Sequence, residues 1–168
     1  KNNYILMKNN KSKKSVVCFG EILWDNLPTG KRPGGAPMNV AYHLHKLGIN
    51  SHLISSIGND QSGVELMGFL KGIGLKTDLV QIDREHATSE VQASVNPSNH
   101  EVSYEIISPV AWDFITWQPN FEFLLSEAQA FVFGTLSARN ITSRNTLYKM
   151  LEHGSYHVFD VNLRAPHY

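Results

Sequence analysis

The sequence predicts an α/β fold, in which helices cover both faces of a parallel sheet and a small β-hairpin forms a flap. Two observations support this prediction. Short, uniformly apolar segments alternate with amphipathic ones, and one further pair of segments alternates apolar with polar residues. Strands buried on both faces are typical of helix-covered parallel sheets. Alternating segments instead indicate strands with one solvent-facing side, as in an antiparallel hairpin.

The core elements are expected to follow one another as βαβ units. Pro37 suits the first turn of a helix, and Gly48 suits the C-terminal cap of the same helix. Asp60 or Ser62 can cap a second helix, and Thr142 can cap a third. We expect strands at 15–22, 52–57, 79–82, 130–133 and 157–161, helices at 36–47, 60–73 and 142–153, and a Pro- and Gly-rich loop at 27–37.

The buried face of each of the first two helices is predicted from the spacing of apolar residues at three and four positions. On this basis the inward-facing residues are Val40, Ala41, Leu44 and Leu47 in the first helix, and Val64, Met67 and 70–73 in the second.

The flap is predicted from two stretches with a period of two residues. In 88–95 the valines and the alanine fall on one side, and 101–107 repeats the alternation. The intervening stretch 96–100, with the sequence NPSNH, has the composition of a turn. We therefore expect an antiparallel hairpin over one edge of the sheet.

Charge and cysteine content exclude several classes of protein. Fifteen basic and fifteen acidic residues give a formal charge of zero, which argues against nucleic acid or an anionic membrane as the main partner. Five of the lysines fall in 1–14, which we expect to be a flexible leader or a non-native remnant, with Met7 as a candidate start. Cys18 is alone and is expected to be an inert core thiol. No His-Glu-x-x-His pattern or other zinc motif is present, so no metal site is expected.

The most informative stretch is GGAPMNVAYHLHKLGINSHLISSIG, residues 34–58. Gly34 and Gly35 precede a helix start, where the absent Cβ atoms let backbone N–H groups approach a ligand. Asn39 offers both a donor and an acceptor, which suits sugar hydroxyls. Taken alone, a plain glycine turn with a capping asparagine explains these residues better than a binding site does.

The spacing of the whole stretch resembles the N-terminal signature of the PfkB/ribokinase family of carbohydrate kinases, in its fructokinase-like branch. The matching features are the two glycines, Asn39, Ala41, and the Gly-x-Asp turn at 58–60. Asp25 fits the family's carboxylate after the first strand, and FGTLS at 133–137 and FDVNLR at 159–164 fit later strand ends. The resemblance spans 16–166 and implies a ribokinase-like fold with lid elements near 26–34 and 88–107.

The resemblance also implies which residues hold the substrate. Asp25 would accept hydrogen bonds from two sugar hydroxyls. Gly134 stands where ribokinase-type members carry a ribose-contacting carboxylate, which points to a hexose instead. For Glu90 and Tyr104, sugar contact within the lid and simple lid packing both stay open. The implied substrate-binding set is Asp25, Gly34, Gly35, Asn39, Asn162 and Arg164, with Glu90 and Tyr104 as lid candidates.

The implied activity is transfer of a phosphoryl group from Mg-ATP to a primary sugar hydroxyl, with fructose or a related hexose as substrate. The family's Gly-Ala-Gly-Asp motif, which carries its general base, does not occur in this sequence. We therefore expect this chain to supply the sugar pocket and lid, and ATP, Mg²⁺ and a monovalent cation to be bound mainly elsewhere. Alternatives are a non-catalytic sugar-binding module and a nucleoside kinase. A cytoplasmic location and a homodimer formed through the lid are also expected.

Overall fold

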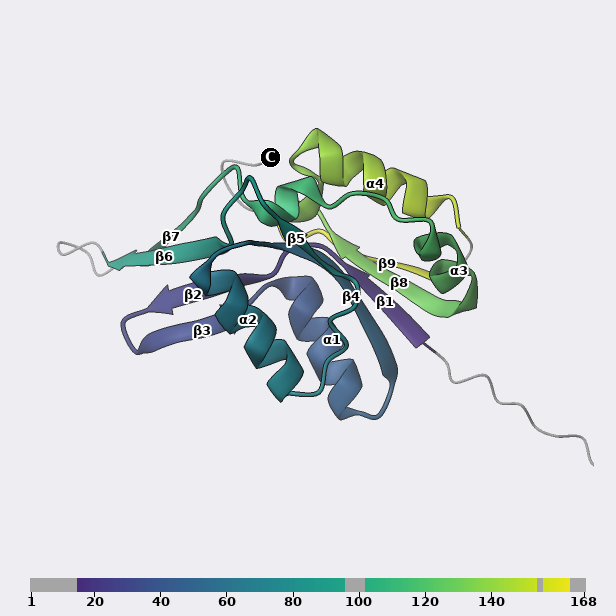
Figure 1. Cartoon of the computed structure of the whole chain (residues 1–168), viewed down its shortest axis with the longest axis horizontal. Helices are drawn as coiled ribbons and strands as arrows, with labels where there is room; N and C mark the ends of the chain where they lie inside the picture. Colours follow the sequence, from purple (N-terminus) through teal and green to yellow (C-terminus); the bar gives the residue numbers. More distant parts are fainter. Residues whose placement is uncertain (1–14, 96–101, 154–155, 164–168) are drawn as a thin grey trace, which may run out of the picture.

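A five-stranded parallel sheet forms the centre of the molecule in the computed structural model, which describes residues 15–95, 102–153 and 156–163 (Figure 1). The strand order is β5-β4-β1-β8-β9, and every neighbouring pair is parallel. This arrangement confirms the predicted fold class. The strands are β1 (Ser15–Phe19), β4 (Asn50–Gly58), β5 (Val80–Asp83), β8 (Ala128–Gly134) and β9 (Tyr156–Asp160).

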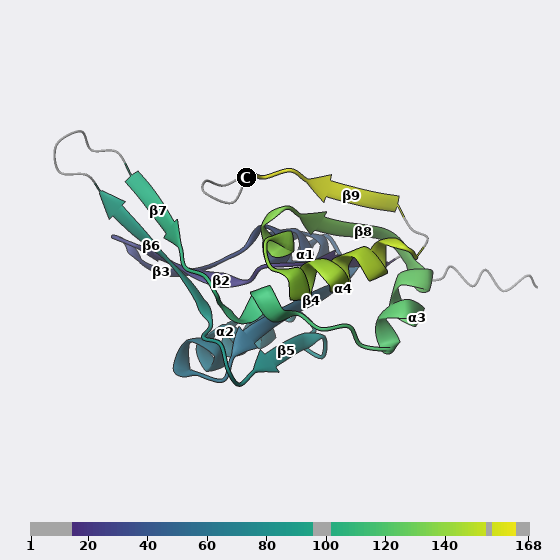
Figure 2. The same cartoon turned by 90° about the horizontal axis from the view of Figure 1, so that it is seen from above.

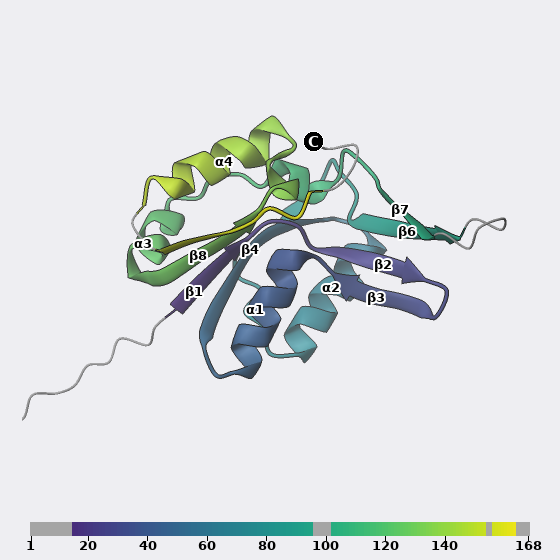
Figure 3. The ribbon, with the colours of Figure 1, turned by 180° about the vertical axis from the view of Figure 1, so that it is seen from behind.

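Helices cover both faces of this sheet (Figure 3). On one face lie α1 (Ala36–Lys46) and α2 (Gln61–Gly72), and on the other lie α3 (Asn120–Glu127) and α4 (Ile141–Leu151). Short 3₁₀ turns, η1 (Ala111–Phe114) and η2 (Leu136–Ala138), join the second layer to the sheet.

The alternation of side chains along β1 divides the core into two clusters. Cys18 packs with the α1 and α2 layer, whereas Val17 and Phe19 pack with the α3 and α4 layer. All three side chains are fully buried. Burial on both faces favours apolar side chains at successive positions, which is why the sequence is uninterruptedly apolar at 16–19.

A second sheet of four strands projects beyond one end of the core (Figure 2). Its order is β3-β2-β6-β7, and we call it the lid sheet. The pair β6-β7 is the predicted antiparallel hairpin, and its predicted turn at 96–100 lies outside the described residues, as does the predicted leader at 1–14. The strands are β2 (Leu23–Leu27), β3 (Gly30–Gly34), β6 (Ser89–Val95) and β7 (Val102–Ile106).

The loop predicted at 27–37 is wrong, because most of this stretch belongs to β2 and β3. The two strands pair antiparallel across a tight turn that ends at Gly30, whose φ is 116°. Pro33 lies in β3, at the outer edge of the lid sheet. An edge strand tolerates proline because no further strand needs its missing N–H.

The predicted buried faces of α1 and α2 are only partly correct. Ala41 is buried, but Val40 and Leu47 are exposed, and Val64 is 65% exposed. Met38 supplies the α1 contact that periodicity missed. Each of these helices packs through a narrow face, so apolar residues adjacent to it stay in solvent.

Helix caps were partly predicted. The Asp60 carboxylate accepts a hydrogen bond of 2.7 Å from the Gly63 N–H and caps α2, as expected. Asn140, rather than Thr142, caps α4, since its side chain accepts a bond from the Thr142 N–H. Helix α3 was not predicted. Within the described ranges no helix has the length and apolar character needed to cross a membrane.

Candidate functional site

A cavity of about 660 Å³ lies between the lid sheet and the carboxyl end of the parallel sheet. Four predicted substrate-binding residues line it: Asp25, Gly35, Asn39 and Asn162. Ligands of open α/β sheets bind at the carboxyl ends of the strands, so the position favours a binding site. A cavity of about 720 Å³ also lies at the opposite end, but its lining includes none of the predicted residues.

The glycine pair brings the start of α1 close to two carboxylate-bearing segments. Gly35 has a φ of 110°, and a Cβ there would collide with the Glu21 carbonyl group. Gly35 therefore requires glycine, whereas a Cβ on Gly34 would collide with the side chains of Asp25 and Leu23, which would have to move. Gly34 thus lies against Asp25 although it does not itself line the cavity. The Asn39 N–H donates to the Gly35 carbonyl oxygen at 2.9 Å, which begins the helix.

Asp25 lies in the middle of β2, the second strand of the lid sheet. It pairs with Arg32 of β3 on one side and with Val91 of β6 on the other. Val91 also lines the cavity and is buried. The carboxylate predicted to bind the substrate is therefore carried by the lid sheet, and a movement of that sheet would move Asp25 with it.

Glu21 is a cavity-lining residue that sequence reasoning missed. Only 3% of it is exposed, and its Oε1 accepts a hydrogen bond of 3.1 Å from the Ala36 N–H. Burial raises the pKa of Glu21 to about 7, against the lowering effect of backbone hydrogen bonds. The signal available in the sequence was an acidic residue directly after an apolar strand, beside Gly20.

Asn162 reaches the cavity from the segment that follows β9. Its N–H donates to Asp160 Oδ1 at 3.1 Å, which forms a local turn. The Thr135 hydroxyl donates to the Val161 carbonyl oxygen at 2.9 Å and ties this turn to the end of β8. Arg164, the neighbouring predicted residue, lies outside the described residues.

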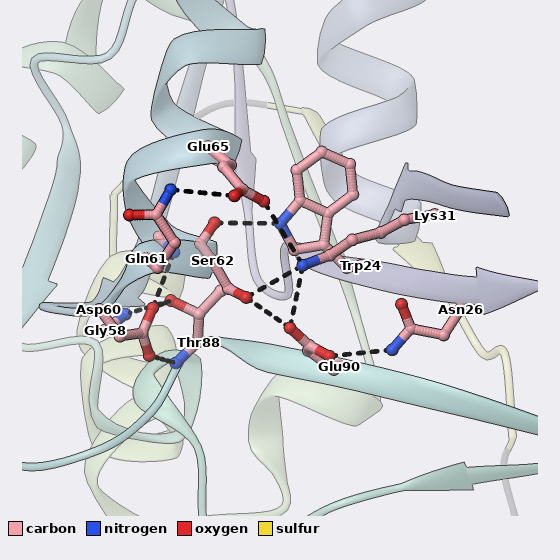
Figure 4. A network of polar contacts seen from close by, with 11 residues as sticks. Trp24, Asn26, Lys31, Gly58, Asp60, Gln61, Ser62, Glu65, Thr88 and Glu90 are labelled. Carbon is pink, nitrogen blue, oxygen red and sulfur yellow. Dashed lines mark hydrogen bonds and ion pairs between the residues drawn. The ribbon is translucent and has the colours of Figure 1, made fainter.

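Glu90 lies away from the cavity, in a polar network on the α2 side of the lid sheet (Figure 4). Its Oε1 accepts from Lys31 Nζ at 3.0 Å and from the Ser62 hydroxyl, and its Oε2 accepts from the Asn26 amide at 2.9 Å. Of the two alternatives for Glu90, the structure thus favours lid packing over sugar contact. The hydrogen bonds from Ser62, Asn26 and Lys31 lower the pKa of Glu90 to about 2.

Tyr104, the other lid candidate, is placed only by its backbone. It lies in β7 and pairs with Ala93 of β6. Its side chain is outside the description, so its role in the lid stays a prediction.

The α2 side of the lid also holds the Gly-x-Asp turn. Asp60 Oδ2 accepts from the Thr88 N–H at 2.7 Å, and Oδ1 accepts from the Thr88 hydroxyl at 2.7 Å. Burial acts to raise the pKa of Asp60, but the hydrogen bonds from Thr88 and Gly63 outweigh it and hold this pKa below its ordinary value. Asp60 therefore joins α2 to the start of the strand that leads into the lid.

Side chains typical of metal sites do not cluster in the described ranges. No three His, Cys, Asp or Glu side chains are grouped there so that they could hold a metal ion.

The lid sheet, the cavity and the glycine turn at the start of α1 define an α/β unit with a candidate ligand-binding cavity at the carboxyl end of its parallel sheet. A family model described as pfkB family carbohydrate kinase matches residues 11–168. The chain belongs to this family.

Individual relatives agree with this assignment. A fructokinase from Solanum tuberosum is 29% identical, with 90% of this chain and 52% of the relative covered. A sugar kinase from Pyrococcus horikoshii, solved in complex with ATP, has a TM-score of 0.76 at 29% identity, covering 90% of this chain and 54% of that one.

A third relative is a fructokinase double mutant from Vibrio cholerae O395, solved with fructose, ADP and potassium ion bound. It has a TM-score of 0.71 at 25% identity, covering 90% of this chain and 51% of that one. The chain spans about half the length of the curated relatives it matches.

Proposed function

We propose that this chain forms the sugar-binding part of an ATP-dependent sugar kinase, which phosphorylates a primary hydroxyl of fructose or a related hexose. The observation that carries the proposal is the cavity beneath the lid sheet. It brings Asp25 of β2 and Asn39 of α1 together with Asn162, which lies near the opposite end of the described chain. Carboxylate and amide groups around a partly apolar wall suit a polyhydroxylated, uncharged ligand.

Each polar group has a role that its chemistry allows. The Asp25 carboxylate accepts hydrogen bonds from two sugar hydroxyls, and Asn39 and Asn162 offer both donors and acceptors. Gly35 lets the backbone at the start of α1 border the cavity, and Gly34 leaves room for the Asp25 carboxylate. These contacts fix the sugar so that one hydroxyl is presented to the phosphoryl donor, which lowers the entropic part of the barrier.

The lid sheet excludes water from the bound sugar in this proposal. Because Asp25 is part of the lid sheet, sugar binding and lid position are coupled. Exclusion of water strengthens the hydrogen bonds in the site and limits hydrolysis of ATP.

The phosphoryl donor and cations are proposed from the relatives. One relative was solved with ATP, and another with fructose, ADP and potassium ion. We infer that ATP, Mg²⁺ and a monovalent cation serve the full-length protein and are held mainly outside these residues, as is the general base. The homodimer through the lid and the cytoplasmic location stay predictions.

The test incubates the full-length protein with ATP and a panel of hexoses, pentoses and nucleosides. It measures the release of ADP and detects the phosphorylated product. We expect a hexose to be phosphorylated most efficiently. Asp25→Asn should raise the sugar KM and lower kcat, with a loss of about 100-fold in kcat/KM, because hydrogen bonds to a charged acceptor are replaced by weaker ones.

The matched control is Asp78→Asn, the same chemical change at an exposed residue away from the cavity. It should leave both constants unchanged. Preference for a nucleoside would reassign the acceptor, and the absence of any phosphorylated product would contradict the proposal. Unchanged kinetics in Asp25→Asn would remove Asp25 from the site.

A further inference from the structure

Glu21 carries a polar atom that the protein itself does not satisfy. Its Oε1 accepts a hydrogen bond from the Ala36 N–H, but its Oε2 is shielded from solvent and has no hydrogen-bond partner among the described residues. Buried carboxylate oxygens are almost always paired, so an unpaired one requires an explanation. Glu21 also lines the cavity, in the company of Asp25, Asn39 and Asn162.

The position of Glu21 joins the cavity to the first turn of α1. Through Ala36 it holds the turn that contains Gly35, and that turn leads directly into Asn39. The backbone on the other side is fixed as well, since the Gly20 N–H donates to the Ile54 carbonyl oxygen at 3.1 Å. The side chain is therefore held in place without the help of a ligand.

Nearby charges do not satisfy Glu21. The carboxylate of Asp160 lies close enough to oppose its ionisation, and the positive charge of Arg139 favours ionisation only weakly. The Arg139 guanidinium is already paired with Asp113, at 2.7 Å from Nε to Oδ1 and 2.8 Å from a terminal nitrogen to Oδ2. The partner for Oε2 must therefore come from outside the described residues.

We propose that Glu21 is a specificity-determining residue of the cavity, whose Oε1 fixes the start of α1 and whose Oε2 pairs with one hydroxyl of the bound sugar. This inference rests on the proposed function. A hydroxyl can donate to an ionised carboxylate or accept from a protonated one, so it suits this oxygen in either form. A site with a buried polar group discriminates strongly against an analogue that lacks its partner, because that group is then left unpaired.

The proposal predicts a particular pattern among deoxy sugars. In the full-length wild-type protein, removal of the hydroxyl that pairs with Glu21 should cost about 30-fold in kcat/KM or in affinity. In Glu21→Gln this loss should shrink to a few-fold for that analogue alone, and the losses for the other monodeoxy analogues should stay as in the wild type.

The experiment measures kcat/KM, and calorimetric affinity, of the preferred sugar and its monodeoxy analogues for wild type, Glu21→Gln and Glu21→Asp. Glu152→Gln, at the exposed C-cap of α4, is the matched control. Thermal unfolding establishes that each variant is folded. If Glu21→Gln does not fold, Glu21→Asp shortens the side chain and carries the same test.

The outcomes separate this inference from the proposed function. An analogue whose penalty depends on Glu21 supports the inference. A penalty pattern that is identical in wild type and variants, or that shifts equally for all sugars, would mean a structural role only and would overturn it. If the protein phosphorylates sugars but the penalties do not depend on Glu21, the proposed function stands and only this inference fails. If the wild-type protein neither binds nor phosphorylates any sugar, both fail.

Discussion

Glu90 and Asp60, on the α2 side of the lid sheet, differ from Glu21, on the cavity side, in how fully the protein hydrogen-bonds their carboxylates. On the α2 side, both Glu90 oxygens and both Asp60 oxygens accept hydrogen bonds from the protein. On the cavity side, Glu21 is almost completely buried, and one of its oxygens has no partner in the part of the chain that the structure describes. Carboxylates that the protein satisfies stabilise the fold, whereas an unsatisfied one leaves a place for a ligand group.

The pKa values of these carboxylates follow the same division. Hydrogen bonding lowers the pKa of Glu90 to about 2, and burial raises the pKa of Glu21 to about 7. Stability should therefore depend on pH in opposite senses for the two sides. Three substitutions test this division, from the largest expected effect to the smallest.

Asp60→Ala should cause the largest loss, about 4 kcal/mol in the free energy of unfolding. It removes three hydrogen bonds of 2.7 Å to a charged acceptor, from Gly63 and from the backbone and side chain of Thr88. It also removes the cap of α2. Urea unfolding at pH 7 measures the loss.

Asp60→Asn and Thr88→Val provide controls for that measurement. Each keeps some of the hydrogen bonds between Asp60, Gly63 and Thr88, so each should cost less than Asp60→Ala. The double variant Asp60→Ala/Thr88→Val should lose less free energy of unfolding than the sum of the two single variants. A cost below about 1 kcal/mol for Asp60→Ala would contradict the claim that this side of the lid sheet stabilises the fold.

Glu21→Gln should remove a pH-dependent loss of about 3 kcal/mol from the free energy of unfolding. The pKa of Glu21 is raised from 4.5 to about 7 in the folded protein. Below pH 4.5 the group is protonated in both states. As pH rises from 4.5 to 7 only the unfolded chain ionises, so the wild type loses stability over this window, and above pH 7 the loss is complete.

The measurement is urea unfolding of wild type and Glu21→Gln at intervals between pH 4 and pH 8. The difference between the two free energies should move in favour of the variant across this window and then become constant. Glu152→Gln, at an exposed position, should run parallel to the wild type. A constant difference between wild type and Glu21→Gln would show that Glu21 ionises normally in the folded protein.

The fold was predictable from the sequence where burial dictates composition. Strands such as β1 and β8 are buried on both faces, and their apolar runs therefore predicted a parallel sheet. The β2-β3 pair was missed because Pro33 and Gly30 are typical of loops, and only its place at a sheet edge permits it. Apolar residues such as Leu47 misled the prediction of helix faces because a solvent-exposed leucine costs little.

The candidate site was predictable where backbone geometry demands one residue type. Gly35 is required by its positive φ and its close approach to the Glu21 backbone, and four predicted residues do line the cavity. Glu21 could not be found in the same way, because its importance depends on burial and on an unpaired oxygen, neither of which has a local pattern. The orientation of Glu90 likewise depends on which face of β6 meets α2, which requires the strand register.

Lys31→Met should have the smallest effect of the three, about 1 kcal/mol in the free energy of unfolding. The Lys31 ammonium contacts Glu90 at 3.0 Å and Ser62 at 3.0 Å and lies 4.9 Å from the centre of the Trp24 ring, but its side chain is 32% exposed. Partly exposed ion pairs contribute little and are screened by salt.

The measurement is unfolding in low and in high salt, combined with Glu90→Gln in a double-mutant cycle. The coupling energy between Lys31 and Glu90 should be smaller at high salt. Because this network faces away from the cavity, Lys31→Met should leave the deoxy-sugar pattern unchanged; a change as large as that in Glu21→Gln would erase the distinction between the two sides of the lid sheet.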